Sequence, residues 1–115
     1  MSRARPEAKI QEAVVLHLRQ RAPADCFWFH PPNGGFRTPW EAAAFKRMGV
    51  RPGVPDLILI HDGRVHGLEL KAKGGRSTEA QLLARADLER AGGYASEAVG
   101  LDIALAVLES WELLR

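Results

Sequence analysis

The sequence predicts an α/β fold in which helices flank a small mixed β-sheet. Two short apolar runs meet at Asp62-Gly63, a dipeptide typical of a β-hairpin turn. Two other segments open with helix-capping residues, and apolar residues near the N-terminus recur at helical spacing. The expected elements, in order, are a helix over 5–21, a strand over 26–30, a helix over 38–48, strands over 57–60 and 65–71, a helix over 78–91, a strand over 94–99 and a helix over 101–114, the last of which also has a composition that fits a strand.

The first helix is predicted by Pro6 and Glu7 in its first turn and by basic residues near its end. At about 100° per residue, its apolar side consists of Ile10, Val14 and Leu18. Glu7 and Gln11 fall in the same sector, whereas Glu12 points away from it. Because an acid on a buried stripe is costly unless something compensates it, Glu7 is the candidate functional acid of this helix. The alternative is that Glu7 only favours the helix N-terminus and lies in solvent.

Two further helices are predicted by capping boxes, in which the cap residue and a Glu or Gln three positions later satisfy each other's backbone groups. The pairs are Thr38 with Glu41 and Thr78 with Gln81. Between the second helix and the hairpin, residues 51–55 contain two prolines and form a stiff connector. This connector delivers Asp56 to the start of its strand.

The hairpin turn also predicts which side chains face each other. With Asp62 and Gly63 as a two-residue turn, counting back along both strands places Asp56 opposite Glu69, with their Cβ atoms roughly 4.5 to 5.5 Å apart. Lys71 returns to the same face, because strand side chains alternate. Two carboxylates this close repel each other unless a cation lies between them. The hairpin therefore predicts a metal-and-water site, and the alternative is a surface ladder of ion pairs.

These residue types suit the hydrolysis of a phosphodiester. Mg²⁺ in proteins takes oxygen ligands, typically one or two carboxylates with waters and substrate phosphate oxygens, and Asp56 and Glu69 supply such a pair. A metal ion bound there can activate water and polarise a phosphoryl oxygen. Lys71 adds a compact positive charge that can hold the water or stabilise charge on the phosphate.

The positions of the charged residues along the chain are more informative than the net charge. Sixteen basic and fourteen acidic side chains give a small positive excess, which does not by itself indicate nucleic acid. The basic residues gather in three groups: Arg3, Arg5 and Lys9; Arg37, Lys46, Arg47 and Arg51; and Lys71, Lys73 and Arg76. A basic rim around an acidic centre suits a polyanion held over a metal, and the alternative is an ordinary solvated surface.

The length of 115 residues predicts a single domain over 1–115. Cys26 is the sole cysteine, so an internal disulfide is excluded, and a reduced, cytoplasmic setting is expected. No apolar segment approaches the length of a membrane span, and no apolar signal core follows the basic N-terminus. Membrane attachment is therefore not expected.

Several short motifs together resemble the VRR-NUC domain, the virus-type replication-repair nuclease branch of the PD-(D/E)xK superfamily. The resemblance covers nearly the whole chain and rests on Glu7 with Gln11, Pro31-Pro32-Asn33-Gly34, Lys46 to Gly49, Gly53-Val54-Pro55-Asp56, Glu69-Leu70-Lys71 and Gln81. It implies a restriction-endonuclease-like core. Domains of this type also occur as small free-standing proteins of phages and bacteria.

The resemblance implies roles for individual residues. The catalytic set would be Glu7, Asp56, Glu69, Lys71 and Gln81, and the metal ligands for Mg²⁺ or Mn²⁺ would be Glu7, Asp56, Glu69 and the carbonyl of Leu70. Gln81 has a simple capping role as its alternative, and Asn33 is a substrate contact or only a turn residue. The candidate DNA-binding residues are Asn33, Arg37, Lys46, Arg51, Lys73 and Arg76.

The expected function is that of a Mg²⁺- or Mn²⁺-dependent endonuclease, selective for DNA structure over sequence because phosphate contacts position without specifying. Similarity to stand-alone family members implies activity like that of a Holliday junction resolvase and a homodimer. The alternatives are cleavage of flaps, nicked duplex or RNA, and a DNA-binding module without turnover. The histidines are expected in surface or core roles, and Trp40 is either a core or interface anchor or a stacking platform for an exposed base.

Overall fold

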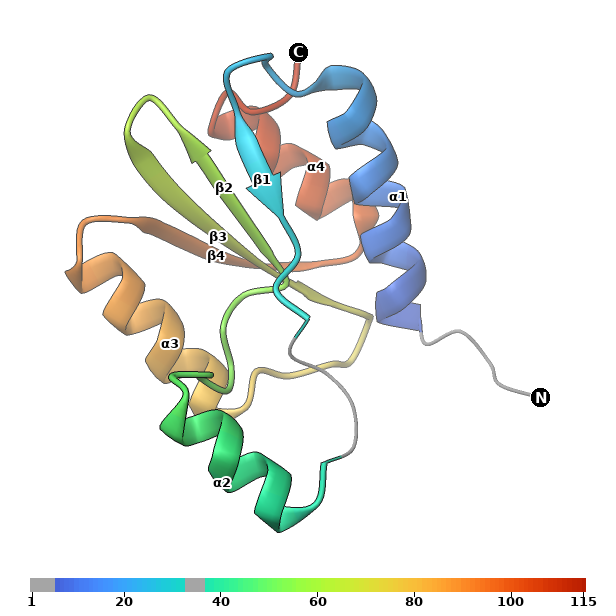
Figure 1. Ribbon diagram of the computed structural model, residues 1–115. Helices are drawn as coiled ribbons and strands as arrows, with labels where there is room; N and C mark the ends of the chain where they lie inside the picture. The colour runs from blue at the N-terminus through green and yellow to red at the C-terminus, as the bar shows by residue number, and fades with distance from the viewer. Residues whose placement is uncertain (1–5, 33–36) are drawn as a thin grey trace.

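A computed structural model describes residues 6–32 and 37–115. Its helices are α1 (Pro6–Arg21), α2 (Pro39–Arg47), α3 (Glu79–Arg90) and α4 (Leu101–Ser110), and its strands are β1 (Phe27–Phe29), β2 (Leu57–His61), β3 (Arg64–Lys71) and β4 (Tyr94–Val99) (Figure 1). The strands form one mixed sheet in the order β1-β2-β3-β4, with β4 parallel to β3 and the other neighbours antiparallel. The α/β fold with a small mixed sheet is thus as predicted.

The hairpin has the register expected from its turn. His61 pairs with Arg64 and Leu57 with Leu68, and both turn residues have positive φ, 53° at Asp62 and 72° at Gly63. Positive φ at both positions is the signature of a type I′ turn, whose twist matches that of the strands. One step beyond the last ladder pair, this register brings Asp56 opposite Glu69.

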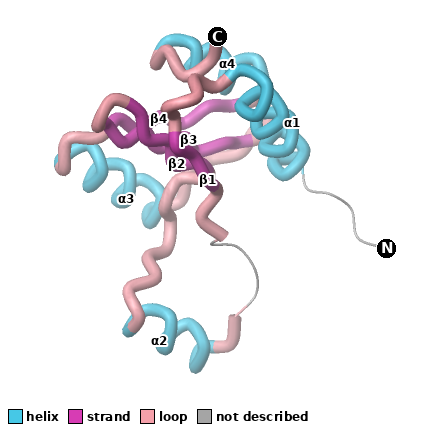
Figure 2. Tube along the Cα trace, turned by 45° about the horizontal axis from the view of Figure 1, so that its top comes forward, coloured by secondary structure: helices cyan, strands magenta, loops and turns pink. Residues whose placement is uncertain are grey.

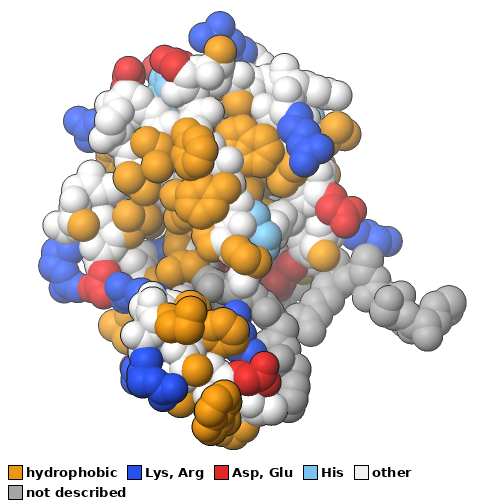
Figure 3. All heavy atoms as spheres, viewed as in Figure 1, with side chains coloured by type: hydrophobic (Ala, Val, Ile, Leu, Met, Phe, Trp, Pro, Cys, Tyr) orange, Lys and Arg blue, Asp and Glu red, His pale blue; other side chains and the backbone are white. Residues whose placement is uncertain are grey.

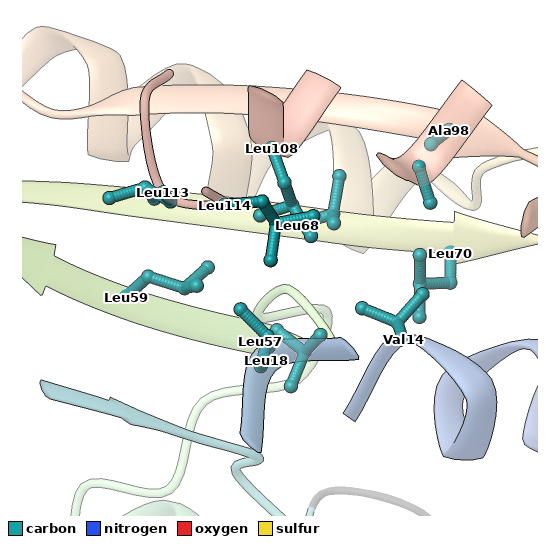
Figure 4. Close-up of a cluster of buried hydrophobic side chains, with 11 residues drawn as sticks. Val14, Leu18, Leu57, Leu59, Leu68, Leu70, Ala98, Leu108, Leu113 and Leu114 are labelled. Atoms are coloured by element: carbon teal, nitrogen blue, oxygen red, sulfur yellow. The ribbon is translucent and has the colours of Figure 1, made fainter. Parts of the chain in front are cut away.

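The core lies on one face of the sheet. The helices α1 and α4 cover that face and α3 lies on the other, as Figure 2 shows. Figure 4 shows the buried side chains between sheet and helices, among them Val14, Leu18, Leu57, Leu59, Leu68, Leu70 and Leu108. Leu57 and Leu59 alternate with half-buried Ile58 and Ile60, so β2 turns its leucines to this core and its isoleucines to the α3 side.

The last segment is helical, which decides between helix and strand, but the helix is shorter than expected. It ends at Ser110, with Trp111 as its C-cap, and the next residue, Glu112, has a φ of 62°. A left-handed residue ends a helix by reversing the chain direction. The reversal places Leu113 and Leu114 back in the core, where both are buried.

The helix α2 differs from the other three because none of its residues is buried. Figures 1 and 2 show it apart from the sheet, beyond the end of the sheet where β2 begins. Its capping box is present as predicted, with the Thr38 hydroxyl accepting from the Glu41 backbone and the Glu41 carboxylate accepting from the Thr38 backbone. Local hydrogen bonds, rather than packing, hold its first turn.

Candidate active site

The two predicted acids meet at the start of β2 and the end of β3. The Leu70 backbone N–H donates to Asp56 Oδ2 over 2.7 Å, which fixes the half-buried Asp56 carboxylate against β3. Glu69 is 2% exposed, and its Oε1 is buried without a hydrogen-bond partner among the described residues. A buried carboxylate oxygen left unpaired costs free energy. The site therefore has an oxygen that is ready to accept a ligand.

The electrostatics of Glu69 reflect this crowding. Burial, followed by the negative charge of the facing Asp56, raises the pKa of Glu69 to about 8. The positive charges of Lys71 and Arg85 act in the opposite direction but are outweighed. Two facing acids whose repulsion the neighbouring cations do not offset favour retention of a proton. The hairpin register predicted that these two acids face each other.

Gln81 joins the lysine to the acid. Lys71 Nζ donates to Gln81 Oε1 over 2.8 Å, and Gln81 Nε2 donates to Glu69 Oε2 over 3.1 Å. Lys71 Nζ and Glu69 Oε2 are 3.8 Å apart. Gln81 Oε1 also accepts from the Thr78 backbone N–H, at 2.9 Å, as part of the capping box. The glutamine thus caps α3 and positions Lys71 with the same amide, so the two roles predicted for it are compatible.

A second cation, Arg85, lies beside the acids and was not predicted. Its Nη2 donates to Ser77 Oγ over 2.9 Å and lies 4.0 Å from Glu97 Oε1. Ser77 in turn donates to Glu97, which pairs with Glu69 in the parallel β3–β4 ladder. The helical spacing of Gln81 and Arg85 places them on one face of α3, a signal present in the sequence. The position of Glu97 beside Glu69, in contrast, depends on the order of the strands in the sheet.

Glu7 lies at the edge of this site. Its side chain is exposed, so the expectation that it continues the buried stripe of α1 is wrong, although Val14 and Leu18 on that stripe are buried. The first turn of α1 runs past the end of β3 (Figure 1), where no strand covers it. Glu7 Oε2 lies 3.3 Å from the point that a Cβ on Gly75 would occupy, so the carboxylate borders the loop after Lys71. Glu12 is also exposed.

The start of β2 has one further anchor. His30 Nδ1 forms a hydrogen bond of 2.6 Å with the Asp56 carbonyl oxygen. This bond connects the end of β1 to the residue that carries the first acid. His30 is exposed, in agreement with the surface or core role expected for the histidines, and it also contacts the backbone of Asp56.

A protein of known structure resembles this chain along almost its whole length. A solved structure described as a VRR_NUC domain protein matches the chain with a TM-score of 0.78 and 28% identity, over 97% of this chain and 93% of that one. This chain has the VRR-NUC fold. The predicted resemblance is thereby confirmed at the level of fold, and a VRR-NUC fold is a nuclease-like domain. No protein-family model matches the chain, and no curated protein matches it.

The basic residues predicted around the candidate site differ in their surroundings. Lys46, Lys73 and Arg76 are exposed. The Arg51 guanidinium lies 2.5 Å from Asp87 on α3, and the Arg37 guanidinium lies over the Phe45 ring at 4.3 Å. Asn33 lies outside the described residues. Two of the six predicted DNA contacts therefore have intramolecular partners as well.

A separate acidic group lies at the other end of the hairpin. Asp25, His61 and Asp62 have potential ligand atoms within 4.8 Å of one another, and they are the one such group of three among the described residues. The Nε2 atom of His61 is 3.0 Å from Asp25 Oδ1. Since this group surrounds the turn, it is separated from Asp56 by the length of β2. Glu7, Asp56 and Glu69 do not form a group of this kind.

Proposed function

We propose that this protein is a divalent-metal-dependent DNA endonuclease that hydrolyses phosphodiester bonds. The observation that carries the proposal is the buried carboxylate of Glu69, which has one oxygen without a partner and is flanked by Asp56, Lys71 and Gln81. A bound cation would satisfy this oxygen, which the ion pair of Lys71 with Glu69 Oε2 leaves unpaired. The VRR-NUC fold supports the same class of activity.

The donor set fits Mg²⁺ or Mn²⁺. Asp56 and Glu69 offer hard carboxylate oxygens, and the carbonyl of Leu70 lies in the same strand segment. Bound there, the metal ion would supply Lewis-acid activation of water and of a phosphoryl oxygen. Glu7, at the edge of the site, is proposed to bind the same ion through a water molecule, because its carboxylate is exposed and borders the loop after Lys71.

The chain's own groups prepare the site for attack on phosphorus. The Lys71 side chain is 7% exposed, and its Nζ is held in place by Gln81 Oε1. The ammonium still has donors available for the attacking water or a phosphate oxygen. Its fixed position matters because catalysis depends on preorganised charge. Gln81 Nε2 holds Glu69 Oε2 and leaves Glu69 Oε1 directed to another ligand.

The substrate is proposed to be branched DNA, as for Holliday junction resolvases, cut by a homodimer in the cytoplasm of a bacterial or phage-infected cell.

An apolar surface supports the dimer. On the α3 side of the sheet, β1 exposes 64% of Phe27 and 41% of Phe29, and Figure 3 shows hydrophobic side chains gathered over this part of the molecule. Large exposed apolar patches mark interfaces. No helix of the described chain is long and apolar enough to span a membrane.

The test is cleavage of labelled four-way junction, flap, nicked duplex, single-stranded DNA and RNA with Mg²⁺ or with EDTA. We expect metal-dependent cleavage of the junction, loss of at least about a hundredfold in Asp56→Asn and Lys71→Ala, and no change in Glu12→Gln. If the protein cleaves flap, nicked duplex or RNA in preference to the junction, the proposed substrate is wrong but the proposed nuclease activity stands. A folded, metal-loaded protein that binds DNA and cuts none of them would show a binding module instead.

A further inference from the structure

The outer face of α2 contributes no residue to the candidate active site. Trp40 is 79% exposed, although an indole ring is among the largest apolar side chains. At the helical period of about 100° per residue, Arg47 lies on the same face as Trp40, with the small residues Ala43 and Ala44 between them. This face therefore combines one flat aromatic ring and one guanidinium across a surface that lacks bulk.

The helix α2 is anchored through its C-terminal connector and does not pack into the core. A helix of nine residues is marginal in water on its own, and α2 contributes no buried residue to the core. Its C-terminal connector, in contrast, is tightly fixed to α3. A Cβ on Gly53 would lie 2.4 Å from the Ala80 carbonyl oxygen, and Arg51 pairs with Asp87. The protein thus fixes the connector of an uncovered helix at Gly53, three residues before Asp56.

The charge around this face identifies the kind of partner. Residues 37–55 carry four basic side chains, Arg37, Lys46, Arg47 and Arg51, and one acidic side chain, Glu41. Glu41 is already engaged by the backbone and hydroxyl of Thr38, and these hydrogen bonds lower the pKa of its carboxyl. In Figure 3 the lobe at the bottom, which is α2, presents hydrophobic and basic side chains together. A polyanion with flat apolar faces complements such a surface.

We infer that the outer face of α2 binds an unpaired nucleotide of the DNA, whose base stacks on Trp40 while its backbone phosphate pairs with Arg47. Stacking needs a base that is free of its duplex neighbours, so this contact distinguishes single-stranded segments from continuous duplex. It rests on the proposed function and refines its substrate, since within the class of branched DNA it favours molecules that contain an unpaired segment.

The test measures binding in the Asp56→Asn protein with EDTA, so that cleavage does not interfere. Two fluorescent DNAs of equal duplex length are compared by anisotropy, one blunt and one with a five-nucleotide single-stranded flap. We expect Trp40→Ala to weaken flap binding about tenfold, as for the loss of one base stack, and to leave blunt-duplex binding within about twofold. Trp40→Phe restores most of the affinity, and Met48→Ala, which removes another exposed apolar side chain near α2, has no effect.

A direct signal comes from indole fluorescence. The difference between the parent protein and Trp40→Phe isolates the emission of Trp40, which the flap quenches and the blunt duplex does not. The proposal is overturned if Trp40→Ala weakens the binding of both DNAs equally, or weakens the binding of neither. A third outcome also overturns the proposal: the Trp40→Ala protein is a monomer in sedimentation where the parent is a dimer, yet it binds the flap as tightly. The face of α2 would then bind a second copy of the chain. Absence of cleavage by the wild type with Mg²⁺ refutes the nuclease, yet leaves this binding comparison interpretable.

Discussion

Replacing Glu69 with glutamine separates the stability of the fold from its activity. In the metal-free protein, burial and the facing Asp56 raise the pKa of Glu69 to about 8, so the folded state holds a proton that the unfolded chain releases near pH 4.5. At pH 7 this proton uptake costs about 3 kcal/mol, at 1.36 kcal/mol per pH unit. Glu69→Gln has no proton to take up, and its amide matches the shape of the protonated acid.

We therefore expect Glu69→Gln to raise the free energy of unfolding by about 3 kcal/mol at pH 7 in EDTA, while it abolishes cleavage. The sign follows from linkage: the folded pKa is raised, so the contribution of Glu69 is fully favourable below about pH 4.5 and decreases as pH rises to about 8. The gap between variant and wild type should widen across this window, then level off.

The assay is urea denaturation at several pH values, with EDTA and with Mg²⁺. Mg²⁺ is expected to stabilise the wild type, because it binds the folded state alone, and to leave Glu69→Gln unchanged. Glu89→Gln, an exposed acid of α3, serves as the control and should follow the wild type throughout. A Glu69→Gln protein that is less stable than the wild type at pH 7 without metal, or a gap independent of pH, would refute the reasoning.

Three further perturbations test the surroundings of the acids. Gln81→Ala removes the amide that holds Lys71, and cleavage rates should fall about tenfold to hundredfold while DNA affinity by anisotropy is retained. Glu7→Gln should slow cleavage far more than Glu12→Gln in the same assay, and equal, mild effects would exclude Glu7 from the site. Gly53→Ala, at a φ of 80° and against the backbone of α3, should lower the free energy of unfolding by about 2–4 kcal/mol in urea; an unchanged midpoint would show that the connector can move.

Much of the fold follows from local chemistry. The turn at Asp62 and Gly63 specifies its own conformation, and pairing then follows by counting. The same holds for the two capping boxes, since each needs only residues three positions apart. The facing of Asp56 and Glu69 could be predicted because it depends on one turn and on the alternation of side chains in a strand.

The remaining parts of the site depend on contacts between distant segments. Glu97 approaches Glu69 because β4 joins β3 in parallel, and no local pattern specifies that order. The bond from His30 to the Asp56 carbonyl likewise spans 26 residues. For Glu7, helical periodicity gave the direction of the side chain, but burial also requires another element to cover that turn. Asp56, Glu69, Lys71 and Gln81 could therefore be predicted from the sequence, whereas the contacts of Glu97 and His30 depend on the tertiary fold.

The two-residue turn has a consequence for how this protein can change. Five ladder pairs separate the turn from Asp56, a span of roughly 17 Å at the rise of a strand, yet the facing of the acids is set there. One residue inserted in β3 just after the turn would exchange the two sides of the rest of that strand, moving Glu69 and Lys71 toward the leucine core and Leu68 and Leu70 toward Gln81. The candidate active site therefore constrains the length of a segment that it does not touch, and natural variation should conserve residue number there more strictly than residue type.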